Sequence, residues 1–212
     1  MIATLSKRQE GPTARTFVAI ELPDDLKNRL QALRTKFGEG AEMLKWTGQA
    51  QLHVTLRFLG DVERSRLHLV VDAASHAASL TKQFSLQLGD LGAFPNERSP
   101  RVLWVGLLED EGKSRLSRLF SVLEEAIVHR GFPPEPLPFS PHLTMARARD
   151  RLSSVDRSRI GRALQELRRS ANLPASIDVR QITVMESSLS AAGARYSPVA
   201  TLPLLLEELK RG

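Results

Sequence analysis

The sequence predicts an α+β protein of two similar lobes, each a small, mainly antiparallel sheet that lines a central cleft, with helices outside. Short β-branched runs alternate along the chain with stretches of helical periodicity. Each half supplies several strands and about two helices. Each half also contains one predicted strand with the pattern His-x-Thr. We therefore expect the halves to resemble each other and to face one cleft.

Apolar runs rich in β-branched residues predict the strands. They lie at residues 15–22, 52–59, 84–91, 101–108, 142–146, 177–186 and 195–205. Helical spacing of apolar residues predicts four helices, at residues 23–38, 67–80, 114–129 and 155–169. Pro23 suits the first turn of a helix and Gly38 suits a helix end. Five prolines exclude regular structure from residues 131–141, and Pro198 and Pro203 place the last strand at a sheet edge.

The composition is that of an ordinary soluble globular protein. The chain has 212 residues, of which 42% are hydrophobic and 25% charged, and no apolar run of membrane-spanning length. Residues 1–14 lack an apolar signal core, so we expect a polar tail before a single bilobal domain at 15–212, in a cytoplasmic monomer. The absence of cysteine excludes a disulfide framework, a thiolate nucleophile and cysteine-ligated zinc.

The chain carries a surplus of positive charge. The formal net charge is +6 and the pI is about 10.1. This surplus favours an anionic partner, with nucleic acid first, although solubility alone explains it equally well. The arginine-rich helix at 155–169 has the same two interpretations, a solvated face or a surface that follows RNA.

Two short segments carry the chemistry. The first reads LHVTLRF and contains His53 and Thr55; the second reads PHLTMAR and contains His142 and Thr144. In a strand, residues i and i+2 point to the same face, so each imidazole lies beside a hydroxyl. A single such pattern is weak evidence because histidine also occurs in cores, but the matched pair favours a shared site.

A site of two imidazoles and two hydroxyls suits phosphodiester hydrolysis. One imidazole deprotonates water and the other protonates the leaving alkoxide, which requires one neutral and one charged histidine. The hydroxyls donate to the non-bridging oxygens, where negative charge grows. No acid or third histidine lies at a convincing spacing for zinc, so we expect no metal and no cofactor.

Further residues are candidates for substrate binding. Arg147, five residues after His142, reaches the same phosphate in this interpretation. Arg57 follows Thr55 in the alternation and either contacts RNA or pairs with an acid. The aromatic candidates for stacking a terminal base, each of which is otherwise a core residue, are Phe17, Phe58, Phe139 and Tyr196. We expect structural or surface roles for the remaining histidines and for both tryptophans.

The chain resembles the two-histidine phosphoesterase superfamily, which is marked by paired His-x-Thr motifs. Within it, the chain is similar to the bacterial and archaeal RNA 2′,3′-cyclic phosphodiesterases, historically called 2′-5′ RNA ligases. The resemblance covers residues 15–205 and rests on five segments that follow one another in the same order as in the family. These are RTFVAIELP, LHVTLRFLGDV, RSPRVLWVGL, PFSPHLTMARA and ITVMESSLSAAGARYSPVATLPL.

The resemblance implies that His53 is the proton donor, His142 the proton acceptor and Arg147 a phosphate ligand. It implies hydrolysis of an RNA 2′,3′-cyclic phosphate to a 2′-phosphate, with 2′-5′ ligation as the reverse reaction. The sequence does not distinguish among fragments of tRNA, other cleaved RNAs and small cyclic nucleotides as the natural substrate. The rival interpretation is a non-catalytic RNA-binding or nucleotide-binding module on the same fold, against which the intact histidines argue.

Overall fold

The computed structural model describes residues 12–171, 175–190 and 193–206. Residues 1–11 of the expected polar tail lie outside this range. The described part contains four α-helices, which are α1 (Asp24–Lys36), α2 (Leu67–Ser79), α3 (Glu111–His129) and α4 (Ser154–Ser170). Its strands are β1 (Thr13–Glu21), β2 (Leu44–Trp46), β3 (His53–Glu63), β4 (Phe84–Phe94), β5 (Val102–Leu107), β6 (Leu143–Ala148), β7 (Ser176–Val179), β8 (Gln181–Ser190) and β9 (Gly193–Pro203).

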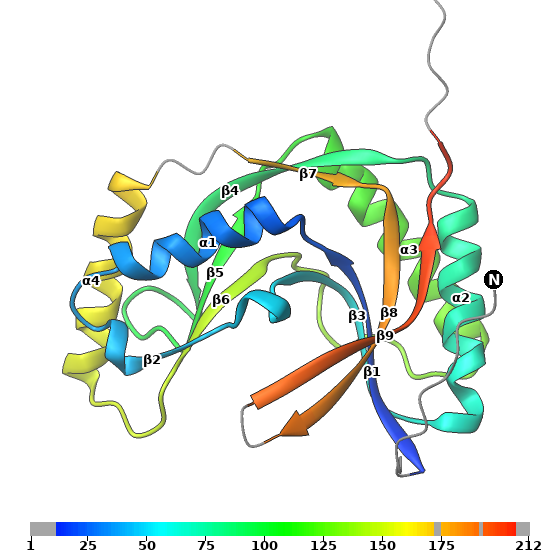
Figure 1. Ribbon diagram of the computed structural model, residues 1–212, viewed down its shortest axis with the longest axis horizontal. Helices are drawn as coiled ribbons and strands as arrows, with labels where there is room; N and C mark the ends of the chain where they lie inside the picture. Colours follow the sequence, from blue (N-terminus) through cyan, green and yellow to red (C-terminus); the bar gives the residue numbers. More distant parts are fainter. Residues whose placement is uncertain (1–11, 172–174, 191–192, 207–212) are drawn as a thin grey trace, which may run out of the picture.

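The strands form one curled sheet (Figure 1). Their order is β7-β4-β5-β6-β3-β1-β8-β9, and β2 pairs with β6 beside this path. The pairs between named strands are antiparallel, as we expected. The two predicted sheets are therefore joined edge to edge, through β3 and β6, into a single surface.

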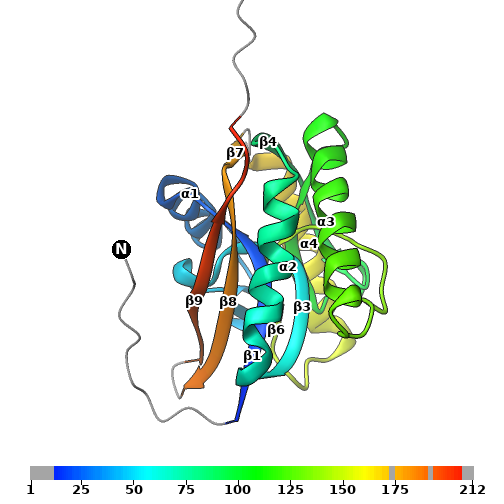
Figure 2. The same ribbon diagram turned by 90° about the vertical axis from the view of Figure 1, so that its right-hand side faces the viewer.

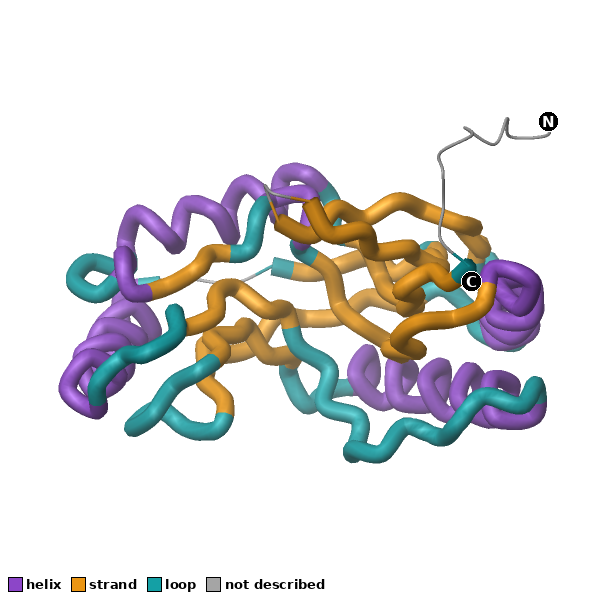
Figure 3. The backbone as a smooth tube through the Cα atoms, turned by 90° about the horizontal axis from the view of Figure 1, so that it is seen from below, coloured by secondary structure: helices purple, strands orange, loops and turns teal. Residues whose placement is uncertain are grey.

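The helices gather at the two ends of this sheet. Figure 3 shows α1 and α4 at one end and α2 and α3 at the other, with the strands between them. Figure 2, viewed from the α2 end, shows the β8–β9 hairpin running alongside that helix. The expected α+β class with helices outside the strands is confirmed.

Local sequence explains where the helices begin. Pro23 precedes α1, whose first turn holds Asp24 and Asp25, where the positive end of the helix dipole favours acids. The Asp110 carboxylate accepts a hydrogen bond from the third residue of α3. Ser153 and Asp156 form a reciprocal capping box at the start of α4. These caps satisfy backbone N–H groups that have no partner within the helix.

The element boundaries follow the prediction closely, with two differences. The expected strand at 177–186 is two strands, because Arg180 breaks the run between β7 and β8. Strand β2 was not predicted; it is too short to show a period. Residues 131–141 contain no helix or strand, and β9 lies at the edge of the sheet, both as predicted.

One β-bulge follows each His-x-Thr pattern. Against β1, Thr55 and Arg57 pair with consecutive residues, so Leu56 is the extra residue in β3. Against β5, Thr144 and Ala146 pair with consecutive residues, so Met145 is extra in β6. A bulge reverses the alternation of side chains beyond it. The fifth residue after each histidine, rather than the fourth, therefore returns to the histidine's face.

Candidate active site

The two His-x-Thr segments lie side by side in the sheet. Val54 of β3 pairs with Leu143 of β6 in antiparallel register, and both side chains are fully buried. Because side chains alternate along a strand, the residues on either side of this pair point to the opposite, open face. Continued by one residue, this register places His53 beside Thr144 and Thr55 beside His142. The four functional groups thus share one face of the sheet.

Both imidazole rings are held in the same way. Nδ1 of His53 lies 2.8 Å from the carbonyl oxygen of Gln51, and Nδ1 of His142 lies 2.7 Å from that of Ser140. A carbonyl oxygen only accepts hydrogen bonds, so Nδ1 carries the proton and donates in both rings. This fixes the tautomer and leaves each Nε2 available for substrate.

Each histidine is flanked by two aromatic rings. Phe17 and Tyr196 contact His53, with ring centroids 4.9 and 5.3 Å away. Phe94 contacts His142 edge-on at 5.1 Å, and the Trp104 ring centroid lies 6.4 Å from it. The sequence did not indicate Phe94 or Trp104, because neither belongs to a motif. Alternation along β5 points the Trp104 side chain to the same face as the histidines, and this alternation is the sequence feature that could have indicated Trp104.

The β8–β9 hairpin brings Tyr196 to His53. Its end reaches the segment before β3, where the Gln51 side-chain amide donates to the carbonyl oxygen of Ala194. Figure 1 shows the hairpin crossing in front of β1. Gln51 thus contacts the hairpin through its side-chain amide and the His53 ring through its backbone carbonyl. Phe17, Met185 and Tyr196 form a small apolar cluster on this face, separate from the main core.

The pKa of each histidine is lowered from its ordinary value of 6.5. For His53 the main cause is burial, which disfavours the charged ring; the charge of His142 lowers it further, while the Gln51 carbonyl and the Glu21 carboxylate raise it. For His142 burial again dominates, the Ser140 carbonyl raises the pKa, and the charge of Arg147 lowers it. The β3–β6 register, which sets both histidines on one face, is consistent with the effect of the His142 charge on His53.

Arg147 lies on the open face, as a consequence of the Met145 bulge, and its side chain is exposed. It is the fifth residue after His142, and Phe58 occupies the equivalent position after His53. The charge of Arg147 lowers the pKa of His142. Lys45 pairs with Arg147 across β2 and β6 and adds a second cation there.

Arg57 does not lie on the open face. Of its two predicted roles, contact with RNA is therefore wrong and pairing with an acid is right. The Leu56 bulge turns Arg57 toward the helix layer, where it is only 4% exposed. Its guanidinium bonds Glu124 of α3 at 2.6 Å and Glu135 at 2.7 Å, and two backbone carbonyl oxygens also accept from it. Arg57 pairs with acids and is not placed to contact RNA.

Phe139 is likewise placed away from the histidines. Its ring stacks on Phe120 of α3, with centroids 4.1 Å apart and planes 2° from parallel. The stack ties the proline-rich segment to α3, and one face of the ring is occupied. Sequence alone gave no signal that separates this phenylalanine from Phe17.

The basic helix α4 uses part of its charge for packing. Arg157 donates to the carbonyl oxygen of Pro100, and Arg168 donates to the carbonyl oxygen of Leu91 and to Glu97. These contacts hold the helix against β4 and the loop that follows it. Glu97 has a lowered pKa, mainly through its hydrogen bond from Arg168. The other arginines of α4, exposed to solvent, are Arg159, Arg162 and Arg169.

Within residues 12–171, 175–190 and 193–206, no group of three or more His, Cys, Asp or Glu side chains is arranged to hold a metal ion. Over the same residues, none of the helices has the length and apolar character needed to cross a membrane.

A family model described as LigT-like phosphoesterase matches the chain twice, at residues 20–104 and 105–196. The chain belongs to this family. Each match contains one His-x-Thr motif, so the two halves that meet at Val54 and Leu143 are repeats of one family unit. The resemblance seen in the motifs is thereby confirmed.

Relatives named RNA 2′,3′-cyclic phosphodiesterase match over most of the chain. One from Methanothermobacter thermautotrophicus is 27% identical over 190 residues, which cover 90% of this chain and 98% of the relative. One from Aeropyrum pernix is 29% identical and covers 79% of this chain and 90% of the relative. A longer relative from Geobacillus stearothermophilus is 27% identical, and the match spans 57% of its length.

Solved structures share the fold. A Thermus thermophilus structure superposes with a TM-score of 0.72 at 25% identity, covering 92% of this chain and all of that one. Escherichia coli LigT in complex with 3′-AMP gives a TM-score of 0.70 at 26% identity, covering 91% of this chain and 98% of LigT. The same LigT has also been solved with ATP.

Proposed function

We propose that this LigT-like phosphoesterase hydrolyses RNA 2′,3′-cyclic phosphate ends to 2′-phosphates, with His53 and His142 as an acid and base pair and without a metal. One observation carries the proposal. Both rings donate Nδ1–H to a backbone carbonyl two residues earlier, and their Nε2 atoms remain available on one face of the sheet. The names of the relatives support RNA cyclic phosphate as the substrate class.

In the proposed reaction, Nε2 of His142 accepts a proton from water as the water oxygen attacks phosphorus. The bond between phosphorus and the 3′ oxygen breaks, and protonated Nε2 of His53 gives its proton to that oxygen. The product carries a 2′-phosphate and a free 3′ hydroxyl. Thr55 and Thr144 donate to the non-bridging oxygens, and Arg147 neutralises their charge. Ligation is the same displacement with the 5′ hydroxyl of a second RNA in place of water: its oxygen bonds to phosphorus, the bond to the 3′ oxygen breaks, and His53 protonates that oxygen, which leaves a 2′-5′ linkage.

One charge beside each ring bears on the order of acid and base. The Glu21 carboxylate, opposite His53 in the β1–β3 register, favours the protonated form of that ring. The Arg147 guanidinium favours the neutral form of His142. The charge of His142 acts against the effect of Glu21, because it lowers the pKa of His53, so the donor and acceptor roles rest on the family resemblance.

Phe17 and Tyr196 are proposed to hold the terminal nucleoside. Their rings meet edge to face at 4.9 Å and both contact His53, so they form one wall of the site. Aromatic surfaces of this kind bind bases of any sequence. Free cyclic nucleotides, tRNA fragments and other cleaved RNAs all present the required group.

The test is incubation of an RNA oligonucleotide with a 2′,3′-cyclic phosphate end in the presence of excess EDTA. We expect complete conversion to a product that co-migrates with authentic 2′-phosphate RNA and not with the 3′-phosphate isomer. Turnover that stops on chelation contradicts the metal-free mechanism. Tight binding with no turnover supports a non-catalytic RNA-binding module instead.

A further inference from the structure

Resting on the proposed function, we propose that Arg15, held on the ring of Phe58, is a second anion subsite. It binds the phosphodiester on the 5′ side of the substrate's terminal nucleotide. The subsite makes the enzyme selective for RNA ends over free nucleoside 2′,3′-cyclic phosphates, which lack that phosphodiester.

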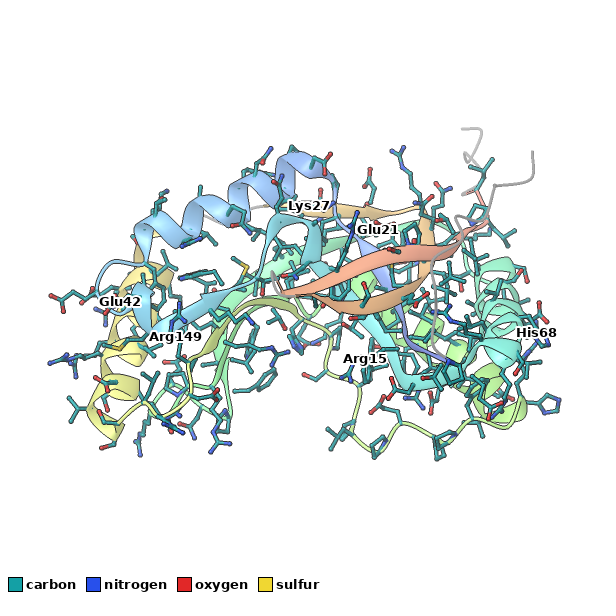
Figure 4. All side chains as sticks on the ribbon, turned by 60° about the horizontal axis from the view of Figure 1, so that its bottom comes forward. Arg15, Glu21, Lys27, Glu42, His68 and Arg149 are labelled. Atoms are coloured by element: carbon teal, nitrogen blue, oxygen red, sulfur yellow. The ribbon has the colours of Figure 1, made fainter. Side chains whose placement is uncertain are left out.

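Arg15 and Phe58 lie on the same face of the sheet as the histidines. In β1, Arg15 alternates with Phe17 and Ala19, whose neighbours in β3 are Phe58 and Thr55. Phe58 reaches this face because the Leu56 bulge reverses the alternation. Figure 4, in which the lower side of the molecule is turned forward, shows Arg15 beneath the β8–β9 hairpin near the middle of the molecule.

The guanidinium is held in place and keeps its hydrogen-bond donors. Its carbon atom Cζ lies 4.8 Å from the centre of the Phe58 ring, a cation–π contact, and the ring is 41% exposed. Among the residues that the structure describes, no ion pair or side-chain hydrogen bond involves Arg15. Arg57 and Arg168, by contrast, have their donors occupied by carboxylates and carbonyl oxygens.

The position of this charge fits the next phosphate along an RNA strand. Phe58 lies opposite Phe17 of β1, and Thr55 lies opposite Ala19. Phe17 and Ala19 are two residues apart, so at about 3.3 Å per residue Phe58 lies about 7 Å along the sheet from Thr55. One nucleotide spans such a distance. Phe17, at the level of Phe58, contacts both His53 and Tyr196, so its ring reaches from that level toward the histidine, where the terminal nucleoside sits in the proposed function.

The two halves of the site also correspond. The fifth residue after His142 is Arg147, a cation on the open face. The fifth residue after His53 is Phe58, which carries the guanidinium of Arg15 on its ring. The residue beyond each bulge is thus associated with one arginine on the open face, Arg147 itself near the reacting phosphate and Arg15 on the Phe58 ring a nucleotide away.

The test compares kcat/KM on three substrates. They are a dinucleotide with a 2′,3′-cyclic phosphate end, the same dinucleotide with a neutral methylphosphonate in its internal linkage, and a nucleoside 2′,3′-cyclic phosphate. We expect R15Q to lower kcat/KM on the charged dinucleotide about tenfold or more, as for a lost hydrogen bond to a charged group. The loss should disappear with the methylphosphonate. R118Q, the same charge change on the exposed side of α3, is the matched control.

An equal effect of R15Q on all three substrates, or none on the charged dinucleotide, overturns the subsite. A binding measurement with the product dinucleotide, which ends in a 2′-phosphate, distinguishes failure of the subsite from failure of the proposed function, because binding requires no turnover. Without turnover, weaker binding by R15Q that requires the charged linkage still supports the subsite. The plot of log K against log salt concentration should then become shallower by about 0.7. An unchanged slope contradicts a phosphate contact at Arg15.

Discussion

Val54 of β3 lies directly opposite Leu143 of β6, and this buried pair sets the two histidines on one surface. Each apolar side chain anchors its strand in the core while the flanking histidine and threonine point to the open face. Two segments nearly 90 residues apart thereby meet with their functional groups in register. The catalytic proposal depends on this juxtaposition.

Removal of either imidazole should abolish most of the activity. We expect H53A and H142A each to lower kcat by about a hundredfold or more on cyclic-ended RNA, because each removes one proton-transfer group. Steady-state kinetics check this, with circular dichroism to confirm folding. H68A, on the exposed side of α2, is the control and should retain wild-type kinetics. A variant at His53 or His142 with near-normal kcat contradicts the role assigned to that ring.

The pH dependence should be bell-shaped and displaced to acid. Activity requires one neutral and one protonated histidine, and burial lowers the pKa of both below 6.5 in the free enzyme. The kcat/KM profile should therefore peak below pH 6.5. A bound phosphate favours the charged rings, so the kcat profile should lie at higher pH than the kcat/KM profile. A kcat/KM optimum above pH 7 contradicts the environments described for the rings.

Sequence alone predicted the four helices, the strands other than β2 (with β7 and β8 as one), and the four polar groups of the two motifs, because alternation and helical periodicity are local properties. The sequence pattern misplaced Arg57, because strict alternation puts this residue on the face of His53. The Leu56 bulge reverses that alternation, and it arises only from the pairing of β3 with β1. Phe94 and Trp104 were not indicated because only the fold brings β4 and β5 to His142. Phe17 and Phe139 looked alike in sequence, yet only Phe17 contacts a histidine.

The buried ion pair of Arg57 and Glu124 should be important for stability. Glu124→Ala removes one of the carboxylates that balance a 4% exposed arginine, and we expect a loss of about 3–5 kcal/mol in the free energy of unfolding. Chemical denaturation measures it. Glu125→Ala, a change at the exposed neighbouring position, should shift stability by less than about 0.5 kcal/mol. Equal effects of the two changes contradict the importance of the pair.

The threonine hydroxyls should matter for the rate more than for folding. Thr55→Val and Thr144→Val keep the side-chain shape but remove the donor to the non-bridging oxygens, and each should lower kcat by about a hundredfold. Thr55→Ser and Thr144→Ser retain the hydroxyl and should recover most of that loss. Valine variants as active as the serine variants indicate that the hydroxyls do not contact the phosphate.

The most direct test of the central claim is a crystal structure with a nucleoside vanadate, which mimics the five-coordinate phosphorus of the transition state. The account predicts that Nε2 of His53 and Nε2 of His142 each lie about 2.6–3.2 Å from different oxygens of the same vanadium. The His53 nitrogen should lie beside the 3′ oxygen. A complex in which only one imidazole reaches the vanadate, with the other turned away, would contradict the two-histidine mechanism.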